Sequence, residues 1–111
     1  MKYEMKDLGY PRTPTDALYR VEMPDGSKWD VPVQCIADSR DDNYSDDKED
    51  TIGSIRDGGL LDSEIDDWAM NNINWDDVKA YAVQAPIASG PRNVNFEEGW
   101  RNGDKKIIGA I

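Results

Sequence analysis

The strongest structural signal in the chain lies in residues 19–33, which read Tyr19-Arg-Val-Glu-Met-Pro-Asp-Gly-Ser-Lys-Trp-Asp-Val-Pro-Val33. Apolar and polar side chains alternate on both sides of the Pro-Asp-Gly sequence at 24–26, a pattern typical of two half-buried strands joined by a turn. A three-residue turn places the apolar odd-numbered residues of both strands on one face, whereas a two-residue turn would mix the faces. Proline sets φ for a type I turn, and glycine takes the left-handed position that follows. The stretch therefore predicts a β-hairpin in which Val21 pairs with Trp29.

Short helices are predicted to follow the hairpin. Apolar residues at three- and four-residue steps predict a helix from about residue 34 to residue 44. A second helix is predicted from Ser63, which can form a variant of the capping box with Asp66, and its buried face is predicted to include Leu61. A third helix is predicted after Asn74, whose side chain can cap it.

The other segments are predicted to be irregular or to form short strands. From the amino end they are a lead-in at 1–16, a mobile acidic loop at 45–59, a short strand at 94–96, a turn at 99–103 and a last strand at 105–108. The chain length fits one domain. We therefore predict a single α+β domain over residues 1–111, in which a small antiparallel hairpin or sheet packs against two or three short helices.

Negative charge is concentrated in the middle of the chain. Of the forty residues from Asp38 to Asp77, fourteen are Asp or Glu and three are Lys or Arg, which gives this segment a charge of −11. The whole chain has a net charge of −10, so its ends nearly balance. Such a segment attracts basic protein surfaces and repels nucleic acid and anionic membranes. We expect a partner protein with a basic surface, no direct binding of nucleic acid and no membrane binding.

The available side chains argue against an enzyme. The chain has no histidine, so the commonest general base and the commonest transition-metal ligand are missing. Its only cysteine, Cys35, has no histidine to activate it as a nucleophile, and its place beside Val33 and Ile36 predicts a small core residue. A calcium loop starting at Asp41 fails, because Asp46 stands where glycine is needed and Ile52 where glutamate is needed. We predict no catalytic residue, no metal site and no cofactor; a metal-dependent enzyme that uses carboxylates alone is the weakest alternative.

Location is predicted from the same composition. A single cysteine permits no internal disulfide, which fits a reducing compartment. No apolar run has the length of a signal peptide or of a membrane span. We therefore expect a cytoplasmic protein.

Acidic side chains on the predicted helices are the candidate contact residues. Carboxylates that project from short helices at repeating distances can imitate DNA, which presents one charge per about 1.7 Å of its axis. The first group comprises Asp62, Glu64, Asp66, Asp67, Asp76 and Asp77, and a second group comprises Asp41, Asp42, Asp46 and Asp47. Trp100, in a turn-like stretch, is the candidate exposed aromatic contact, although core packing is the more ordinary role for a tryptophan. The plainer alternative for the acids is a solvated face that only keeps the protein soluble.

Three stretches carry a resemblance to a known group: the hairpin at 19–33, the segment Ile65–Lys79 with its Asn-Trp-Asp-Asp run, and Val94–Gly103 with its Glu-Gly-Trp run. They resemble small acidic, uncharacterised proteins encoded by bacteriophages and prophages. Small acidic phage proteins often block host defence nucleases, including restriction enzymes and CRISPR complexes, and some do so as DNA mimics.

The resemblance implies a phage-encoded inhibitor of a host nucleic-acid-binding protein or nuclease complex, of the anti-CRISPR or anti-restriction type, acting in the cytoplasm of an infected bacterium. It implies no role for any particular residue. The alternative is a phage accessory or assembly protein that binds another protein through Trp100 and the edge of the hairpin.

Overall fold

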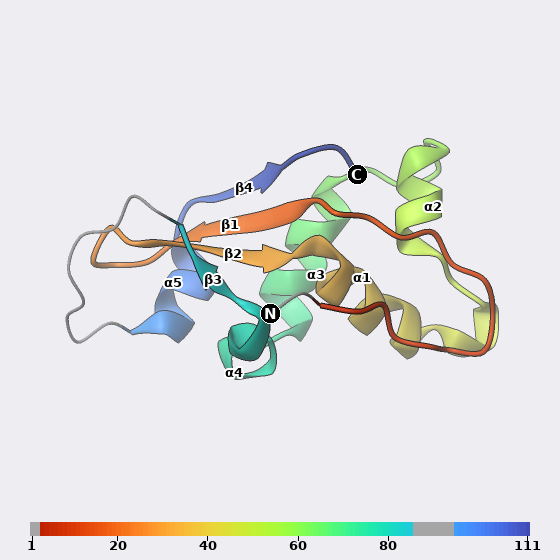
Figure 1. The fold of residues 1–111 in the computed structure, drawn as a ribbon, viewed down its shortest axis with the longest axis horizontal. Coiled ribbons are helices and arrows are strands. Elements are labelled where there is room, and N and C mark those ends of the chain that lie inside the picture. The colour runs from red at the N-terminus through yellow and green to blue at the C-terminus, as the bar shows by residue number, and fades with distance from the viewer. Residues whose placement is uncertain (1–2, 86–94) are drawn as a thin grey trace.

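A computed structural model describes residues 3–85 and 95–111, and Figure 1 shows their arrangement. In chain order the elements are β1 (Leu18–Glu22), β2 (Lys28–Pro32), α1 (Val33–Asn43), the 3-10 helix η1 (Ser45–Asp47), α2 (Thr51–Arg56), α3 (Ser63–Asn72), α4 (Trp75–Val78), the 3-10 helix η2 (Lys79–Tyr81), β3 (Val83–Gln84), α5 (Phe96–Asn102) and β4 (Lys105–Ile108). A four-stranded antiparallel sheet combined with helices confirms the predicted α+β class.

The hairpin of β1 and β2 has the predicted register. Val21 pairs with Trp29 in antiparallel strands. The backbone N–H of Met23 donates to the carbonyl oxygen of Ser27 at 2.7 Å, which closes the three-residue turn. Gly26 has a φ of +86°, the left-handed conformation that its position in the turn requires. The alternation of side chains was sufficient to fix this pairing.

Two further strands flank the hairpin, and the order across the sheet is β3-β2-β1-β4. Strand β4 pairs with β1, which confirms the predicted last strand. Strand β3 was not predicted, because its two residues are too few to show an alternating pattern. The hairpin therefore lies inside the sheet, and its strands are not the edge strands that the assembly-protein alternative requires.

One core lies between the sheet and the helices. Tyr19, Val21 and Val31 point inward from the strands and are at most 1% exposed. They belong to one buried cluster with residues of α1, α2, α3, α4 and α5. Figure 1 shows α4 and α5 below the strands, with α2 beyond the end of the sheet. The opposite face of the sheet presents charged side chains, including the ion pair between Arg20 and Asp30.

Helix α5 replaces the predicted strand at 94–96 and the predicted turn at 99–103, so both predictions are wrong for the described part of those stretches; Val94 lies outside it. The side chain of Asn95 accepts a hydrogen bond from the backbone N–H of Glu98 at 3.0 Å and caps the helix. Acidic residues occupy the first turn, where the helix dipole favours them. Asn95 with the following acids was a helix-start signal that the short aromatic pattern concealed.

Trp100 of α5 is buried, with 0% of its surface exposed, so the prediction of an exposed contact residue is wrong. Its indole N–H donates to the carbonyl oxygens of Ala69 at 3.1 Å and Ile73 at 2.9 Å, near the end of α3. Its ring centroid lies 5.5 Å from that of Tyr19 in an edge-to-face arrangement. Trp100 therefore joins α5, α3 and the sheet, and it offers nothing to a partner.

The predicted loop at 45–59 contains η1 and α2, so that prediction is wrong as well. Asp50 caps α2 by accepting from the N–H of Gly53 at 3.1 Å, and Ile52 is fully buried. Asp50 also accepts from the backbone N–H of Thr13 at 3.1 Å, which ties the lead-in to this helix. Helix α2 was not predicted because its short sequence follows a run of charged residues and because contacts distant in sequence, such as that with Thr13, help to hold it.

The lead-in has no helix or strand over its described residues, as predicted, and α1 spans nearly the predicted range. Helix α3 starts at Ser63 as predicted, but no side chain caps it, and Leu61 is 72% exposed, contrary to the prediction. The predicted cap of α4 is confirmed, since Asn74 and Asp77 form a reciprocal capping box.

Candidate interaction surface

The net charge of the molecule resides in one continuous part of the fold. Residues 33–81, from α1 to η2, contain fourteen acids and four bases and so carry a charge of −10; we call them the acidic segment. The remaining residues contain nine acids and nine bases and are balanced. The acidic segment is made entirely of helices and their connections. Its surface therefore differs in electrostatic character from the sheet.

Two of its acids are buried and hold the fold together. The guanidinium of Arg12 lies 2.7 Å from Asp38 and 3.0 Å from Asp41, and all three side chains are at most 2% exposed. Asp41 also accepts from the backbone N–H of Thr51 at 2.9 Å. The prediction of Asp41 as a surface contact is therefore wrong, because its carboxylate faces the interior.

Asp66 accepts a hydrogen bond from the phenol of Tyr19. Burial and this hydrogen bond raise the pKa of Tyr19. Asp62 and Asp66 also line a groove of about 290 Å³ together with Lys105 and Lys106 of β4. The groove is therefore lined by residues of both charges, although no ion pair joins these carboxylates to the lysines within the described residues.

Three other candidates have partners within the chain. Asp42 pairs with Lys6 at 2.8 Å, and Asp76 pairs with Lys79 at 3.1 Å, in both cases at the surface. Asp77 accepts from the backbone N–H of Asn74 at 2.9 Å. Surface ion pairs of this kind contribute little to stability, so these carboxylates remain accessible to another protein.

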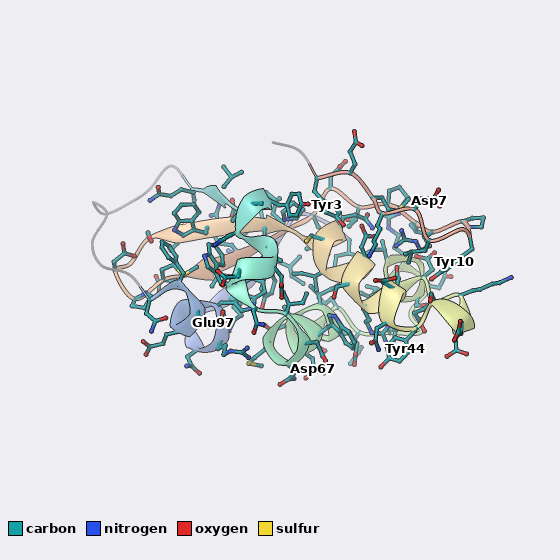
Figure 2. All side chains as sticks on the ribbon, turned by 90° about the horizontal axis from the view of Figure 1, so that it is seen from below. Tyr3, Asp7, Tyr10, Tyr44, Asp67 and Glu97 are labelled. Atoms are coloured by element: carbon teal, nitrogen blue, oxygen red, sulfur yellow. The ribbon has the colours of Figure 1, made fainter. Side chains whose placement is uncertain are left out.

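The most open candidates lie on η1, on α3 and directly before α3. Asp46, Asp47, Asp62 and Asp67 are exposed, and none forms an ion pair within the described residues. Glu64 is half-buried on the same helix as Asp67. Asp67 accepts from the side-chain amide of Asn71 at 3.0 Å, and Figure 2 shows it at the margin of the helical side. Of the ten acids predicted as contacts, these four are therefore exposed and without an ion pair within the described residues.

A cleft of about 510 Å³ lies between the lead-in, α1 and the connection from α3 to α4. It brings Asp38, Asp42 and Asp77 together with Lys6 and Cys35. Burial, with a contribution from Asp38, raises the pKa of Cys35 to about 12, so the reactive thiolate is disfavoured. Within the described ranges no group of three or more Cys, Asp and Glu residues is placed to hold a metal ion.

An aromatic pair on the helical side was missed by the sequence interpretation. The ring centroids of Tyr44 and Trp68 lie 5.8 Å apart, and Tyr44 is 38% exposed. Tyr44 is labelled in Figure 2. Trp68 packs against the core, as predicted, but it is only partly buried, and its indole N–H donates to the hydroxyl of Ser39 at 3.1 Å. A tyrosine inside a polar, charged run was the one signal that pointed to a surface aromatic.

No protein-family model matches the chain, and comparison with curated proteins and with solved structures finds no match. Of the helices described, none is both long and apolar enough to cross a membrane.

Proposed function

We propose that this protein binds a basic, nucleic-acid-binding surface of another protein through its acidic segment and thereby blocks access of nucleic acid to that surface. The observation that carries the proposal is the separation of charge: residues 33–81 hold the whole net charge of −10, and the rest of the chain is balanced. A concentrated charge of one sign steers association towards surfaces of the opposite sign. Nucleic-acid-binding surfaces are basic, because their lysines and arginines neutralise phosphates.

Internal contacts favour exposed acids over buried ones as the contact residues. Asp38 and Asp41 pair with the buried guanidinium of Arg12, and Asp66 accepts a hydrogen bond from the phenol of Tyr19. Of the acids left at the surface, Asp67 projects from α3 and Asp62 directly precedes it, and α3 contributes Ile65 and Ala69 to the core. Asp46 lies on η1, between α1 and α2, which both contribute residues to that core. A rigid display loses little conformational entropy on binding, which favours affinity. In this way the protein acts as a DNA mimic, and Asp46, Asp62 and Asp67 are the first contacts we propose.

The resemblance to phage-encoded proteins directs the proposal towards host defence. A phage gains from blocking restriction enzymes or CRISPR complexes, and both bind DNA through basic surfaces. We propose a non-enzymatic inhibitor that acts by occupying such a surface inside the infected bacterium. The balanced charge of the remaining residues supports the helical side as the docking face.

The proposal is tested by capture from a bacterial lysate followed by displacement with DNA. Immobilised wild-type protein should retain a nucleic-acid-binding protein, and added duplex DNA should release it, because both compete for one surface. A triple variant, Asp46→Asn, Asp62→Asn and Asp67→Asn, should retain much less of the same protein. Quantitative mass spectrometry of the retained and released fractions measures both effects.

A matched control separates local charge from total charge. Glu4, Asp16 and Asp104 are exposed and lie outside the acidic segment. Changing them to Gln, Asn and Asn raises the net charge by the same three units, and we expect capture to stay near the wild-type level. Equal loss in both triple variants, or retention that duplex DNA leaves unchanged, would refute the proposal.

A further inference from the structure

The partly exposed aromatic pair of Tyr44 and Trp68 lies where α1 ends beside α3. Both rings keep exposed surface: Tyr44 is 38% exposed, and Trp68, which packs against the core and donates to Ser39, is only partly buried. Partly exposed, immobilised aromatic rings are common anchors of protein interfaces, because they bury a large area and lose little conformational entropy on binding. The exposed part of the pair is therefore available to a partner protein.

The surroundings of the pair are polar and negative. Every residue from 42 to 48 is exposed, and this run contains three aspartates and one lysine. Asp67 precedes Trp68, and Glu64 lies one turn before it on α3. An aromatic centre with a carboxylate rim is complementary to a cationic group that can also stack on a ring.

The protein already shows that one ring accepts such a group. The guanidinium carbon of Arg40 lies 5.2 Å from the centroid of the Tyr44 ring. Arg40 is held there by Glu49 at 3.4 Å and by the hydroxyl of Thr51 at 3.0 Å. The local chemistry of ring and carboxylates thus suits a planar guanidinium.

We propose that Tyr44 and Trp68 form the anchor of the docking surface and select arginine side chains on the basic surface of the partner protein. This inference rests on the proposed function and names the chemistry of its contact. Arginine stacks on aromatic rings and pairs with carboxylates in two-point geometry, whereas the more strongly hydrated ammonium of lysine gains less from a ring. Carboxylates alone would bind arginine and lysine about equally. The aromatic pair gives the surface its preference for arginine.

The test compares two peptides of equal charge, hexa-arginine and hexa-lysine, by isothermal titration calorimetry at low salt. Wild-type protein should bind hexa-arginine about two- to fivefold more tightly, the range of an exposed cation–π contact. Tyr44→Leu should remove this preference and leave the affinity for hexa-lysine unchanged.

Two variants serve as controls. Tyr44→Phe, which keeps the ring, should retain the preference, and so should Tyr81→Leu on η2. The indole N–H signal of Trp68, assigned with Trp68→Phe, should shift on addition of hexa-arginine.

The outcomes distinguish this inference from the function on which it rests. Equal affinities for the two peptides in the wild type, or an arginine preference that survives Tyr44→Leu, would overturn the aromatic anchor and leave electrostatic docking intact. Failure of both peptides to bind would count against the inference and against the basic partner together. A preference that depends on Tyr44, accompanied by a shift of the Trp68 signal, would support the anchor.

Discussion

Arg12 lies in an irregular segment, yet it is one of the most completely buried charges described. Asp38 and Asp41 surround its guanidinium, and Asp38 also accepts from the side-chain amide of Gln34 at 2.9 Å. Buried ion pairs rarely stabilise more than apolar residues would, but loss of one partner leaves unpaired buried charge. These two aspartates are therefore structural residues, although they belong to the most acidic part of the sequence.

Arg12→Met should reduce the free energy of unfolding by about 3–5 kcal/mol, because the two buried carboxylates of Asp38 and Asp41 lose the guanidinium that pairs with them. The control is Arg20→Met, which breaks an ion pair with Asp30 in which the arginine side chain is 33% exposed. We expect that change to cost about 1 kcal/mol or less. Urea unfolding followed by circular dichroism measures both variants, and equal losses would contradict the structural role of Arg12.

The sequence predicted the burial of individual side chains less well than it predicted the strands and helices. It identified fourteen acids in one segment, but it could not separate Asp41, which is buried, from Asp42, which is exposed. That difference depends on Arg12, which is distant in sequence and reaches α1 through an irregular segment. Trp100 was misassigned as a contact residue for the same reason, since a tryptophan's exposure depends on which elements cover it.

Among the strands and helices, local pattern succeeded where it was regular. The register of β1 with β2 followed from alternation and from the Pro-Asp-Gly turn, and the cap of α4 followed from Asn74. Helices α2 and α5 were missed because each is short and relies on tertiary contacts more than on its own sequence. Strand β3 was missed because it pairs through only two residues.

Helix α5 packs closely on the hairpin at Gly99, and a substitution there tests this packing. A Cβ added at Gly99 would lie 2.5 Å from the sulfur of Met23 and 3.1 Å from the ring of Pro24. Gly99→Ala should therefore push α5 away and lower the free energy of unfolding by about 1–3 kcal/mol. Thermal unfolding followed by circular dichroism provides the measurement.

Gly59 supplies the comparison for that variant. A Cβ there meets only the carbonyl oxygen of Ser54, at 3.6 Å, which is an ordinary contact. Gly59→Ala should stay within about 0.5 kcal/mol of the wild type. If Gly99→Ala were equally harmless, α5 would not pack on the hairpin as described.

The molecule as a whole combines a single core with two surfaces of different charge. One core joins the strands to α1, α2, α3, α4 and α5, and the acidic segment carries the net charge of −10. The sequence alone predicted this concentration of charge and the α+β class. It could not predict that the charge belongs to the helical side, because that requires the packing of helices on one face of the sheet.

The buried ionisable groups predict that the protein loses stability in alkaline solution. Burial raises the pKa of Cys35 from 9.0 to about 12 and, together with Asp66, raises the pKa of Tyr19. The unfolded chain therefore releases these protons at lower pH than the folded protein does. Stability from these groups is complete below pH 9 and falls as the pH rises from there.

Urea unfolding at pH values from about 7 to about 11 tests this expectation. The free energy of unfolding should decline above about pH 9, and the decline should begin later in Cys35→Ala, which lacks the thiol. A stability curve that is flat or rising over this range would show that neither group is buried as described.

The central claim is that exposed carboxylates of the acidic segment bind a basic surface, and salt tests it most directly. The dissociation constant of the captured partner should be measured by calorimetry at rising sodium chloride concentration, for the wild type and for the Asp46, Asp62 and Asp67 triple variant. We predict that wild-type binding weakens steeply with salt and that the variant binds less tightly with a shallower dependence. A wild-type dissociation constant that salt leaves unchanged, or an equally steep dependence in the variant, would contradict the claim.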